Sequence, residues 1–251
     1  MRNILRYAVG GLGMKKAYAI NGGPRKDGTT ARILAAALEG AKEAGAETKM
    51  INLYDLDFSG CIGCAACKMP AGKSYNKCIL RDQLTPILLE LREADVMFFG
   101  SPMFFGKIAS SLQNFFERIM QPENTNEPYH ATMWPRKTRT ALYLNTELSR
   151  KEFERSGYVY QALAVTRRIF GEFHVRVFTD SLMFFDGYDK FYALQYDERQ
   201  RREYFAKEFV SELEEVRNEA RKMTELPAEL ENPYRDRHLQ WVRDNVPGAR
   251  I

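Results

Sequence analysis

Residues 16–45, KAYAINGGPRKDGTTARILAAALEGAKEAG, indicate the class of fold more clearly than any other part of the sequence. Residues 16–21 are mostly apolar and predict a short buried strand, which ends at a Gly-Gly-Pro turn over 22–24. Residues 30–44 then predict a helix, whose apolar face is made of Ile33, Leu34, Ala37, Leu38 and Ala41. A buried strand that turns sharply into an amphipathic helix is the repeating unit of α/β proteins.

The same alternation continues along the chain. Further strand-like segments lie at 47–53, 95–100, 138–145 and 174–179, and helical patterns at 84–91, 108–119, 158–170 and 205–216. Strands that alternate with helices predict a parallel sheet covered on both faces. Such sheets bind ligands at the carboxyl ends of their strands, near the point where the strand order reverses. The loops that follow the strands are therefore the candidate binding loops.

We expect residues 14–222 to form one domain. Residues 1–13 lack the features of a secretory signal and are expected to be an extension with no role in the fold. Residues 122–138 are rich in proline and polar side chains and are interpreted as a surface loop. The polar segment 223–251 is expected to be a C-terminal tail that wraps a neighbour or frays.

Composition narrows the function classes. Of the 251 residues, 45% are hydrophobic and 28% charged, and the net charge is only +4 with both signs interspersed. A nucleic-acid-binding protein would concentrate basic residues on one face, so that class is disfavoured. No apolar run approaches a membrane span. We expect a cytoplasmic protein whose ligands are small molecules, such as anionic nucleotides.

The loop after the first strand is a candidate phosphate site. It opens a helix whose first amides have no partner within the helix, and these amides together with the helix dipole favour an anion. Arg25 adds a charged fork that matches phosphate oxygens. The alternative is an ordinary turn with Thr30 as the helix N-cap. The residues we expect to bind are Gly23, Pro24, Arg25, Lys26, Gly28, Thr29 and Thr30.

The loop after the central strand is a candidate site for a flat ring. Its aromatic and methionine side chains would form an apolar wall for a planar heteroaromatic group. The alternative is that Phe104 and Phe105 belong to the core. Together with the first loop, it would hold opposite ends of one ligand. The candidate residues are Ser101, Pro102, Met103, Phe104, Phe105 and Gly106.

All four cysteines of the chain, Cys61, Cys64, Cys67 and Cys78, fall within 18 residues. Three thiolates on one tight turn plus a fourth further along favour a [4Fe–4S] cluster as one hypothesis. A zinc ion held by four thiolates, a redox-active dithiol, and four reduced thiols without a metal are the alternatives. A scattered disulfide framework would not group its cysteines in this way.

The stretch 16–222 resembles the flavodoxin-like NADPH-dependent FMN reductase superfamily, through GGPRKDGTT (22–30) and FFGSPMFFGKIASSLQNFFERI (98–119). It is most similar to the iron–sulfur flavoprotein branch, through CIGCAACK (61–68) and DGYDKFYALQYDERQRREYF (186–205). The resemblance implies an α/β three-layer sandwich with a five-stranded parallel sheet of order 2-1-3-4-5. It also implies FMN held by three loops, the third containing Asn145 and Thr146. The family's usual G-S-P-R phosphate loop has Gly23 in place of serine.

The resemblance implies an FMN-dependent oxidoreductase that takes electrons from NAD(P)H and passes them to a quinone, another small acceptor or a redox protein. Alternatives are a non-enzymatic electron carrier with ferredoxin-like partners, and a cofactor-free regulatory protein. Because the flavin performs the chemistry, we expect no catalytic side chain. His130, His174 and His238 are expected to be structural or exposed. A homodimer or homotetramer is expected, with the aromatic segment 183–192 at a contact.

Overall fold

The structure is a computed structural model that describes residues 14–125, 132–146, 150–155, 166–167, 169–179, 198–227 and 232–249. The predicted extension 1–13 and the segment 183–192 lie outside the described residues, as do His130 and most of the helix expected over 158–170. The same is true of the greater part of the stretch 186–205.

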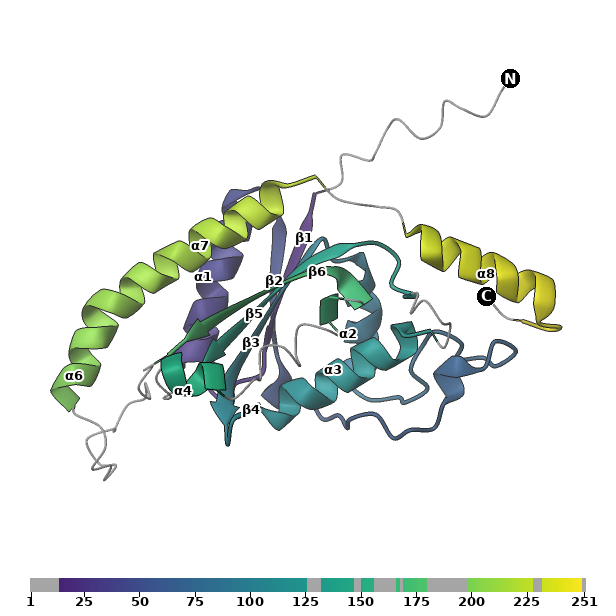
Figure 1. The fold of residues 1–251 in the computed structure, drawn as a ribbon, viewed down its shortest axis with the longest axis horizontal. Coiled ribbons are helices and arrows are strands. Elements are labelled where there is room, and N and C mark those ends of the chain that lie inside the picture. Colours follow the sequence, from purple (N-terminus) through teal and green to yellow (C-terminus); the bar gives the residue numbers. More distant parts are fainter. Residues whose placement is uncertain are drawn as a thin grey trace, which may run out of the picture.

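Five parallel strands form the central sheet, as predicted (Figure 1). In space they follow the order β2-β1-β3-β5-β6, so the predicted order 2-1-3-4-5 is confirmed once the short β4 is set aside. β4 (Lys107–Ile108) pairs antiparallel with the end of β3. The long strands are β1 (Lys16–Asn21), β2 (Glu47–Asn52), β3 (Val96–Phe104), β5 (Thr138–Asn145) and β6 (Gly171–Phe178).

Helices cover both faces of the sheet and complete three layers (Figure 1). α1 and α7 pack on one face, while α2 and α3 pack on the other. The described helices are α1 (Thr29–Glu43), α2 (Leu84–Glu90), α3 (Ser110–Glu123), α4 (Arg150–Arg155), α6 (Glu198–Glu203), α7 (Phe209–Glu225) and α8 (Pro233–Asn245). A π-helical turn, Tyr204–Glu208, joins α6 to α7. None of these described helices combines the length and the apolar character that crossing a bilayer requires.

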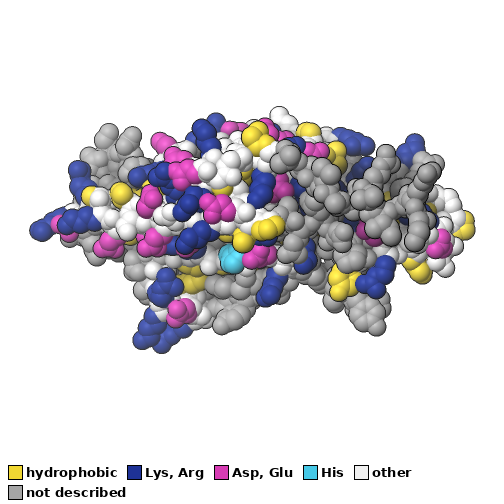
Figure 2. Space-filling model, turned by 90° about the horizontal axis from the view of Figure 1, so that it is seen from above, with side chains coloured by type: hydrophobic (Ala, Val, Ile, Leu, Met, Phe, Trp, Pro, Cys, Tyr) yellow, Lys and Arg dark blue, Asp and Glu magenta, His cyan; other side chains and the backbone are white. Residues whose placement is uncertain are grey.

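Alternation along the central strands sorts side chains between the two layers. In β1, Ala17 and Ala19 contact the α1–α7 layer, whereas Tyr18 and Ile20 face the layer of α2 and α3. Small side chains on the first face allow α1 to lie close to the sheet, and all four are buried. On the surface seen in Figure 2, the described basic and acidic side chains are interspersed, as the sequence indicated.

Two sequence expectations need correction. Residues 122–138 are not simply a surface loop, because α3 extends to Glu123 and the side chains of Met133 and Trp134 are buried. The indole of Trp134 packs edge-on against Phe170 with ring centroids 4.9 Å apart, which explains why this aromatic side chain leaves the solvent.

The segment 223–251 is more ordered than a frayed tail, because it contains α8. Asn232 caps this helix by accepting a hydrogen bond from the Arg235 amide at 3.1 Å. Its Nδ2 also donates to the carbonyl of Trp134 at 2.7 Å. The His238 ring is hydrogen-bonded to the hydroxyl of Tyr75. α8 is therefore attached at one end to the segment that precedes β5 and at its middle to the loop that links Cys67 to Cys78.

We predict that Gly40→Ala lowers the free energy of unfolding by about 1–3 kcal/mol, because overpacking a tight contact forces the backbone apart. A Cβ at Gly40 of α1 would lie 2.0 Å from the carbonyl oxygen of Arg217 in α7. Urea denaturation provides the measurement, with Glu39→Ala on the exposed side of the same helix as control. A stabilised variant, as expected from helix propensity alone, would contradict this packing.

Candidate functional site

The loops after β1, β3 and β5 meet at one edge of the sheet. Asn21 at the end of β1 pairs with Gly100 in β3, and Pro102 pairs with Asn145 at the end of β5. The Gly22 amide donates to the carbonyl of Gly100 at 2.8 Å and continues this pairing into the first loop. The chain runs from β1 to β2 on one side and to β3 on the other, so this edge is the topological switch point.

Asn21 organises the first loop, a role that the sequence analysis missed. Its side chain is fully buried, and its Oδ1 accepts a hydrogen bond from the Gly23 amide at 2.9 Å. Its Nδ2 donates to Asn52 Oδ1 at 3.0 Å, at the end of β2. The available signal was a polar residue that closes a buried strand directly before a Gly-Gly turn.

The N-terminus of α1 is open to an anion. Gly28 is the N-cap, no side chain caps the helix, and its first turn contains no acidic residue. The first helical hydrogen bond runs from the Arg32 amide to the carbonyl of Gly28 at 3.0 Å. Thr30 is inside the helix, so the alternative in which it is the N-cap is wrong. The positive end of the helix dipole is directed at this loop.

The cationic side chains of the loop are exposed, while its threonines are buried. Pro24, Arg25 and Lys26 are on the surface, and Lys26 forms an ion pair with Asp55 at 2.8 Å. Thr29 is only 6% exposed. Arg25 is thus an exposed cation in this loop, whereas Asp55 offsets the charge of Lys26.

A hydrogen bond joins the first loop to the third. Thr30 Oγ1 donates to Asn145 Oδ1 at 2.6 Å, so two predicted binding side chains contact each other. The next residue, Thr146, is buried, and its amide donates to the carbonyl of Phe178 at 3.0 Å. The structure thus brings these two loops together in a defined arrangement.

The second loop forms a projecting hairpin. Ser101 is fully buried, and its hydroxyl accepts from the Ala109 amide at 2.9 Å, which closes the hairpin at its base. At the tip, Phe105 has a φ of +51° and a fully exposed side chain, and Gly106 follows with a φ of +74°. Phe104 is 47% exposed, so the alternative that both phenylalanines belong to the core is wrong. Met103 packs partly against the core.

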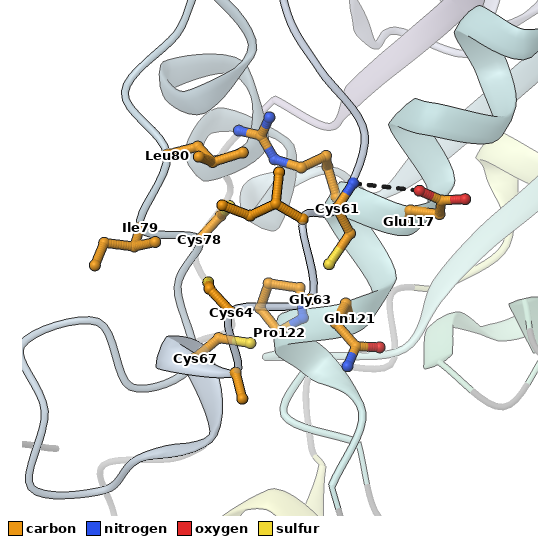
Figure 3. A pocket seen from close by; sticks show the side chains of 13 residues that line it. Cys61, Gly63, Cys64, Cys67, Cys78, Ile79, Leu80, Glu117, Gln121 and Pro122 are labelled. Atoms are coloured by element: carbon orange, nitrogen blue, oxygen red, sulfur yellow. Dashed lines mark hydrogen bonds between the residues drawn. The ribbon is translucent and has the colours of Figure 1, made fainter.

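All four cysteines line one pocket of about 70 Å³ on the side of α3 (Figure 3). The loop bearing the first three turns sharply, with left-handed backbone at Gly63 and Ala65. The Cys61 amide donates to Glu117 Oε2 at 3.2 Å, which fixes the loop to α3. The Asn76 amide donates to the Cys67 carbonyl at 3.0 Å. This bond folds the segment 69–77, which links the first three cysteines to the fourth, back on itself, so the chain re-enters the pocket at Cys78.

This donor set is suited to a metal centre held by sulfur. All four thiols are free, and burial raises the pKa of the Cys67 thiol. Among the described residues no three ligating side chains converge closely enough to hold a metal as they stand. The four thiols nevertheless line one cavity, and Cys61 and Cys64 are close enough to Cys67 to interact with it electrostatically. The residues present therefore fit a tetrathiolate group.

Charged side chains that no sequence pattern indicated adjoin the residues that line the pocket. Lys68 follows Cys67 directly, and its Nζ donates to the carbonyls of Gln121 and Asn124 at the end of α3. Beside it, Glu123 is buried and forms an ion pair with Arg92; burial raises the pKa of Glu123 to about 7. Such pairs join residues far apart in sequence, so no local pattern reveals them.

Arg118 of α3 is the most deeply buried of these charges, with a side chain that is 0% exposed. Its two terminal nitrogens bind both carboxylate oxygens of Asp82, at 2.6 and 3.0 Å. These bonds hold the pKa of Asp82 below its usual value. The remaining donor, Nε, is buried without a hydrogen-bond partner. A donor left in this state costs about 1–3 kcal/mol.

The two described histidines are placed as expected from the sequence. His174 is exposed and adjoins Glu172, with 3.1 Å between Nε2 and Oε1. His238 is buried against Tyr75. Neither histidine belongs to the switch-point loops or to the cysteine pocket.

Comparison with curated proteins gives a partial match. The chain is 36% identical over 103 residues to an iron–sulfur flavoprotein of Methanocaldococcus jannaschii and 31% identical over 103 residues to an iron–sulfur flavoprotein of Methanosarcina thermophila. Each match covers 41% of this chain and 51% of the relative. The aligned region is thus about half the length of these relatives.

Solved structures share the fold over a longer range. An NAD(P)H:quinone oxidoreductase from Methanothermobacter marburgensis matches with a TM-score of 0.60 and 15% identity, over 84% of this chain and 100% of that chain. An FMN-dependent NADH-azoreductase from Bacillus anthracis, solved in complex with FMN, matches with a TM-score of 0.58 and 15% identity over the same shares. These likenesses show that the fold is flavodoxin-like.

A family model covers the part of the chain that builds the first two switch-point loops. The model of NADPH-dependent FMN reductases matches residues 15–142, from the start of β1 into β5. This range is half of the chain, and it includes the first two loops and the cysteine pocket. The chain therefore belongs to the NADPH-dependent FMN reductase family.

Proposed function

We propose that the protein is an FMN-dependent oxidoreductase that takes electrons from NAD(P)H. One observation carries this proposal: in a chain of this family, three loops meet at the switch point of the sheet, beside a helix N-terminus that no side chain caps. Its electron acceptor is a small molecule or a redox protein. We further propose that it acts in the cytoplasm as a homodimer or homotetramer.

The first loop would bind the FMN phosphate. The helix N-terminus at Gly28 supplies amides and the positive end of a dipole, and the buried Thr29 supplies a hydroxyl group. The hydroxyl of Thr30 already donates to Asn145, so Thr30 would contribute its backbone amide. Arg25 adds a cation at the loop surface. Gly23 and Pro24 shape the turn, while Lys26 adds positive charge near Asp55. An anionic tail is the ligand group that this arrangement fits best.

The second and third loops would bind the flavin ring. Met103, Phe104 and Phe105 provide apolar surface beside the switch point, and Gly106 gives the hairpin its tight turn. The exposed aromatic side chains are available for stacking on a flat ring. The hydrogen bond between Thr30 and Asn145 holds the first loop against the third. The phosphate and the ring of one FMN molecule would therefore lie on neighbouring loops.

FMN, once bound, supplies the hydride and electron chemistry, and the residues of the chain bind and orient it. Ser101 keeps the β3–β4 hairpin in place through its buried hydroxyl. The acceptor and the nicotinamide would approach from the side on which Phe104 and Phe105 are exposed. This division of work explains why the site needs no nucleophile or acid–base pair.

We propose that Cys61, Cys64, Cys67 and Cys78 hold a [4Fe–4S] cluster. All four are free and line one pocket, and a compact triplet plus one further thiolate suits a cubane better than paired zinc knuckles. The names of the relatives from M. jannaschii and M. thermophila also support it.

Helix α3 connects the two sites. Ser111 in its first turn donates to the carbonyl of Gly22 at 2.9 Å, whereas Glu117 and Arg118 line the cysteine pocket. Seven residues of helix span roughly 10 Å. The flavin loops and the cysteine pocket therefore flank one short helix, which favours electron exchange between the two groups within the chain.

We predict that purified holoprotein consumes NAD(P)H steadily when a quinone is supplied, because an enzyme regenerates its oxidised flavin at every turnover. Absorbance at 340 nm under anaerobic conditions is the measurement. Reduction of the flavin only by a ferredoxin or dithionite, without NAD(P)H consumption, would instead identify an electron carrier.

Arg25→Ala is expected to weaken FMN binding about ten- to a hundredfold, since it removes a charge-assisted hydrogen bond to the phosphate. Fluorescence titration of apoprotein with FMN and with riboflavin checks this. Riboflavin lacks the phosphate, so its affinity should not change, and Arg199→Ala on α6 is the matched control. Equal affinity of both proteins for FMN would contradict the phosphate assignment.

Cys64→Ser should abolish the broad iron–sulfur absorbance and the bound iron, while FMN binding persists, because the pocket lies apart from the flavin loops. Anaerobic purification followed by iron, sulfide and zinc analysis is the measurement. Ala66→Ser in the same loop serves as control and should keep its iron. Absence of iron from the unmodified protein, or zinc in its place, would refute the cluster.

A further inference from the structure

Arg118 has one donor left over after its structural contacts are counted. A guanidinium carries five N–H groups. The four on Nη1 and Nη2 are directed at acceptors: Asp82 at 2.6 and 3.0 Å, the Ser59 carbonyl at 2.8 Å and Thr85 Oγ1 at 3.4 Å. The fifth, on Nε, is buried and has no partner. Buried polar groups nearly always have a hydrogen-bond partner, so the unpartnered Nε of Arg118 points to a ligand that it could bind.

Arg118 adjoins the cysteine pocket, where a bound group could accept a hydrogen bond from Nε. Arg118 lines this pocket together with the four cysteines, whereas its partner Asp82 does not. The pocket therefore contacts the cationic half of the ion pair. Cys78 is close enough to the guanidinium to interact with it both electrostatically and as a side-chain hydrogen-bond partner, although Nε itself makes no hydrogen bond of regular geometry.

We infer that Arg118 is the internal donor and counter-charge for the group bound by the four cysteines, with its Nε–H directed at Cys78 or a neighbouring sulfide. This inference rests on the proposed cluster. Four thiolates outnumber the positive charge of the iron–sulfur core, so the assembled site is anionic. Nε–H would then have an anionic sulfur as its hydrogen-bond acceptor.

The consequence concerns the reduction potential. One electron from the reduced flavin enters the cluster, no bond forms or breaks, and the site becomes more negative by one charge. A hydrogen bond and a positive charge stabilise the more negative state. Arg118 therefore favours reduction of the cluster, and Asp82 tempers this effect because its carboxylate partly neutralises the guanidinium from outside the pocket.

The two partners of this ion pair are thus predicted to act in opposite directions. Arg118→Met should lower the equilibrium constant for one-electron reduction of the cluster at least tenfold, equivalent to a potential about 59 mV more negative. Arg118→Lys, which keeps the charge but lacks Nε, should lower it by less. Asp82→Asn should raise the constant. A purely structural ion pair would leave the potential unchanged or would shift it in the same direction in both variants.

The experiment is an anaerobic redox titration monitored by electron paramagnetic resonance, with iron and FMN content measured for each protein. The flavin potential is the internal reference and should stay constant. Arg136→Met is the matched control, because Arg136 forms a half-buried ion pair with Asp95, outside the cysteine pocket. That variant should keep the cluster potential of the unmodified protein.

The outcomes separate the inference from the cluster itself. Absence of iron from the unmodified protein would refute the cluster and the inference with it. Full iron with an unchanged potential in Arg118→Met and Arg118→Lys would overturn the inference alone. If Arg118→Met loses iron, Arg118→Lys and Asp82→Asn carry the test through their opposite shifts. Loss of iron from all three, with Arg136→Met intact, would show a structural pair and also overturn it.

Discussion

Backbone pairing between β1 and β3 determines where the binding loops lie. The pairing runs through Asn21 and Gly100 and continues into the first loop through the Gly22 amide. It leaves the start of α1 and the β3–β4 hairpin at the same edge of the sheet. Because both loops begin from paired strands, their separation is fixed by strand spacing rather than by flexible connections. A ligand that reaches both is then held at two points.

Helix α3 extends this constraint to the cysteines. Its first turn is bound to the loop after β1 through Ser111, and its later turns form the wall of the cysteine pocket through Glu117 and Arg118. Because a helix is rigid, a few turns of α3 set the distance between the switch-point loops and the cysteine pocket. The segment 69–77 leaves the cysteine pocket intact, because the Asn76 amide donates a hydrogen bond to the Cys67 carbonyl.

The sequence predicted what depends on local periodicity. Patterns of apolar residues predicted the strand–turn–helix units and the loops that follow the strands. The family resemblance predicted the order of the strands in the sheet. The helix in the C-terminal segment was missed, since α8 is a mostly polar helix. Its cap at Asn232, followed by a proline at the first helical position, was the signal to use.

Pairwise contacts between distant segments were beyond the reach of sequence patterns. The hydrogen bond from Thr30 to Asn145 joins residues 115 positions apart, and the ion pair of Arg118 with Asp82 spans 36. Charged residues on a helix usually face solvent, so nothing local marks Arg118 as fully buried. Such contacts decide how the loops and the pocket are held, and only the folded chain reveals them.

The decisive experiment is a crystal structure of the protein with FMN bound. We expect the phosphate of FMN to lie within hydrogen-bonding distance of the amides at Gly28–Thr30. We expect the flavin ring to lie against Met103 and Phe104. A phosphate bound elsewhere, or a ring that does not contact the β3–β4 hairpin, would contradict it.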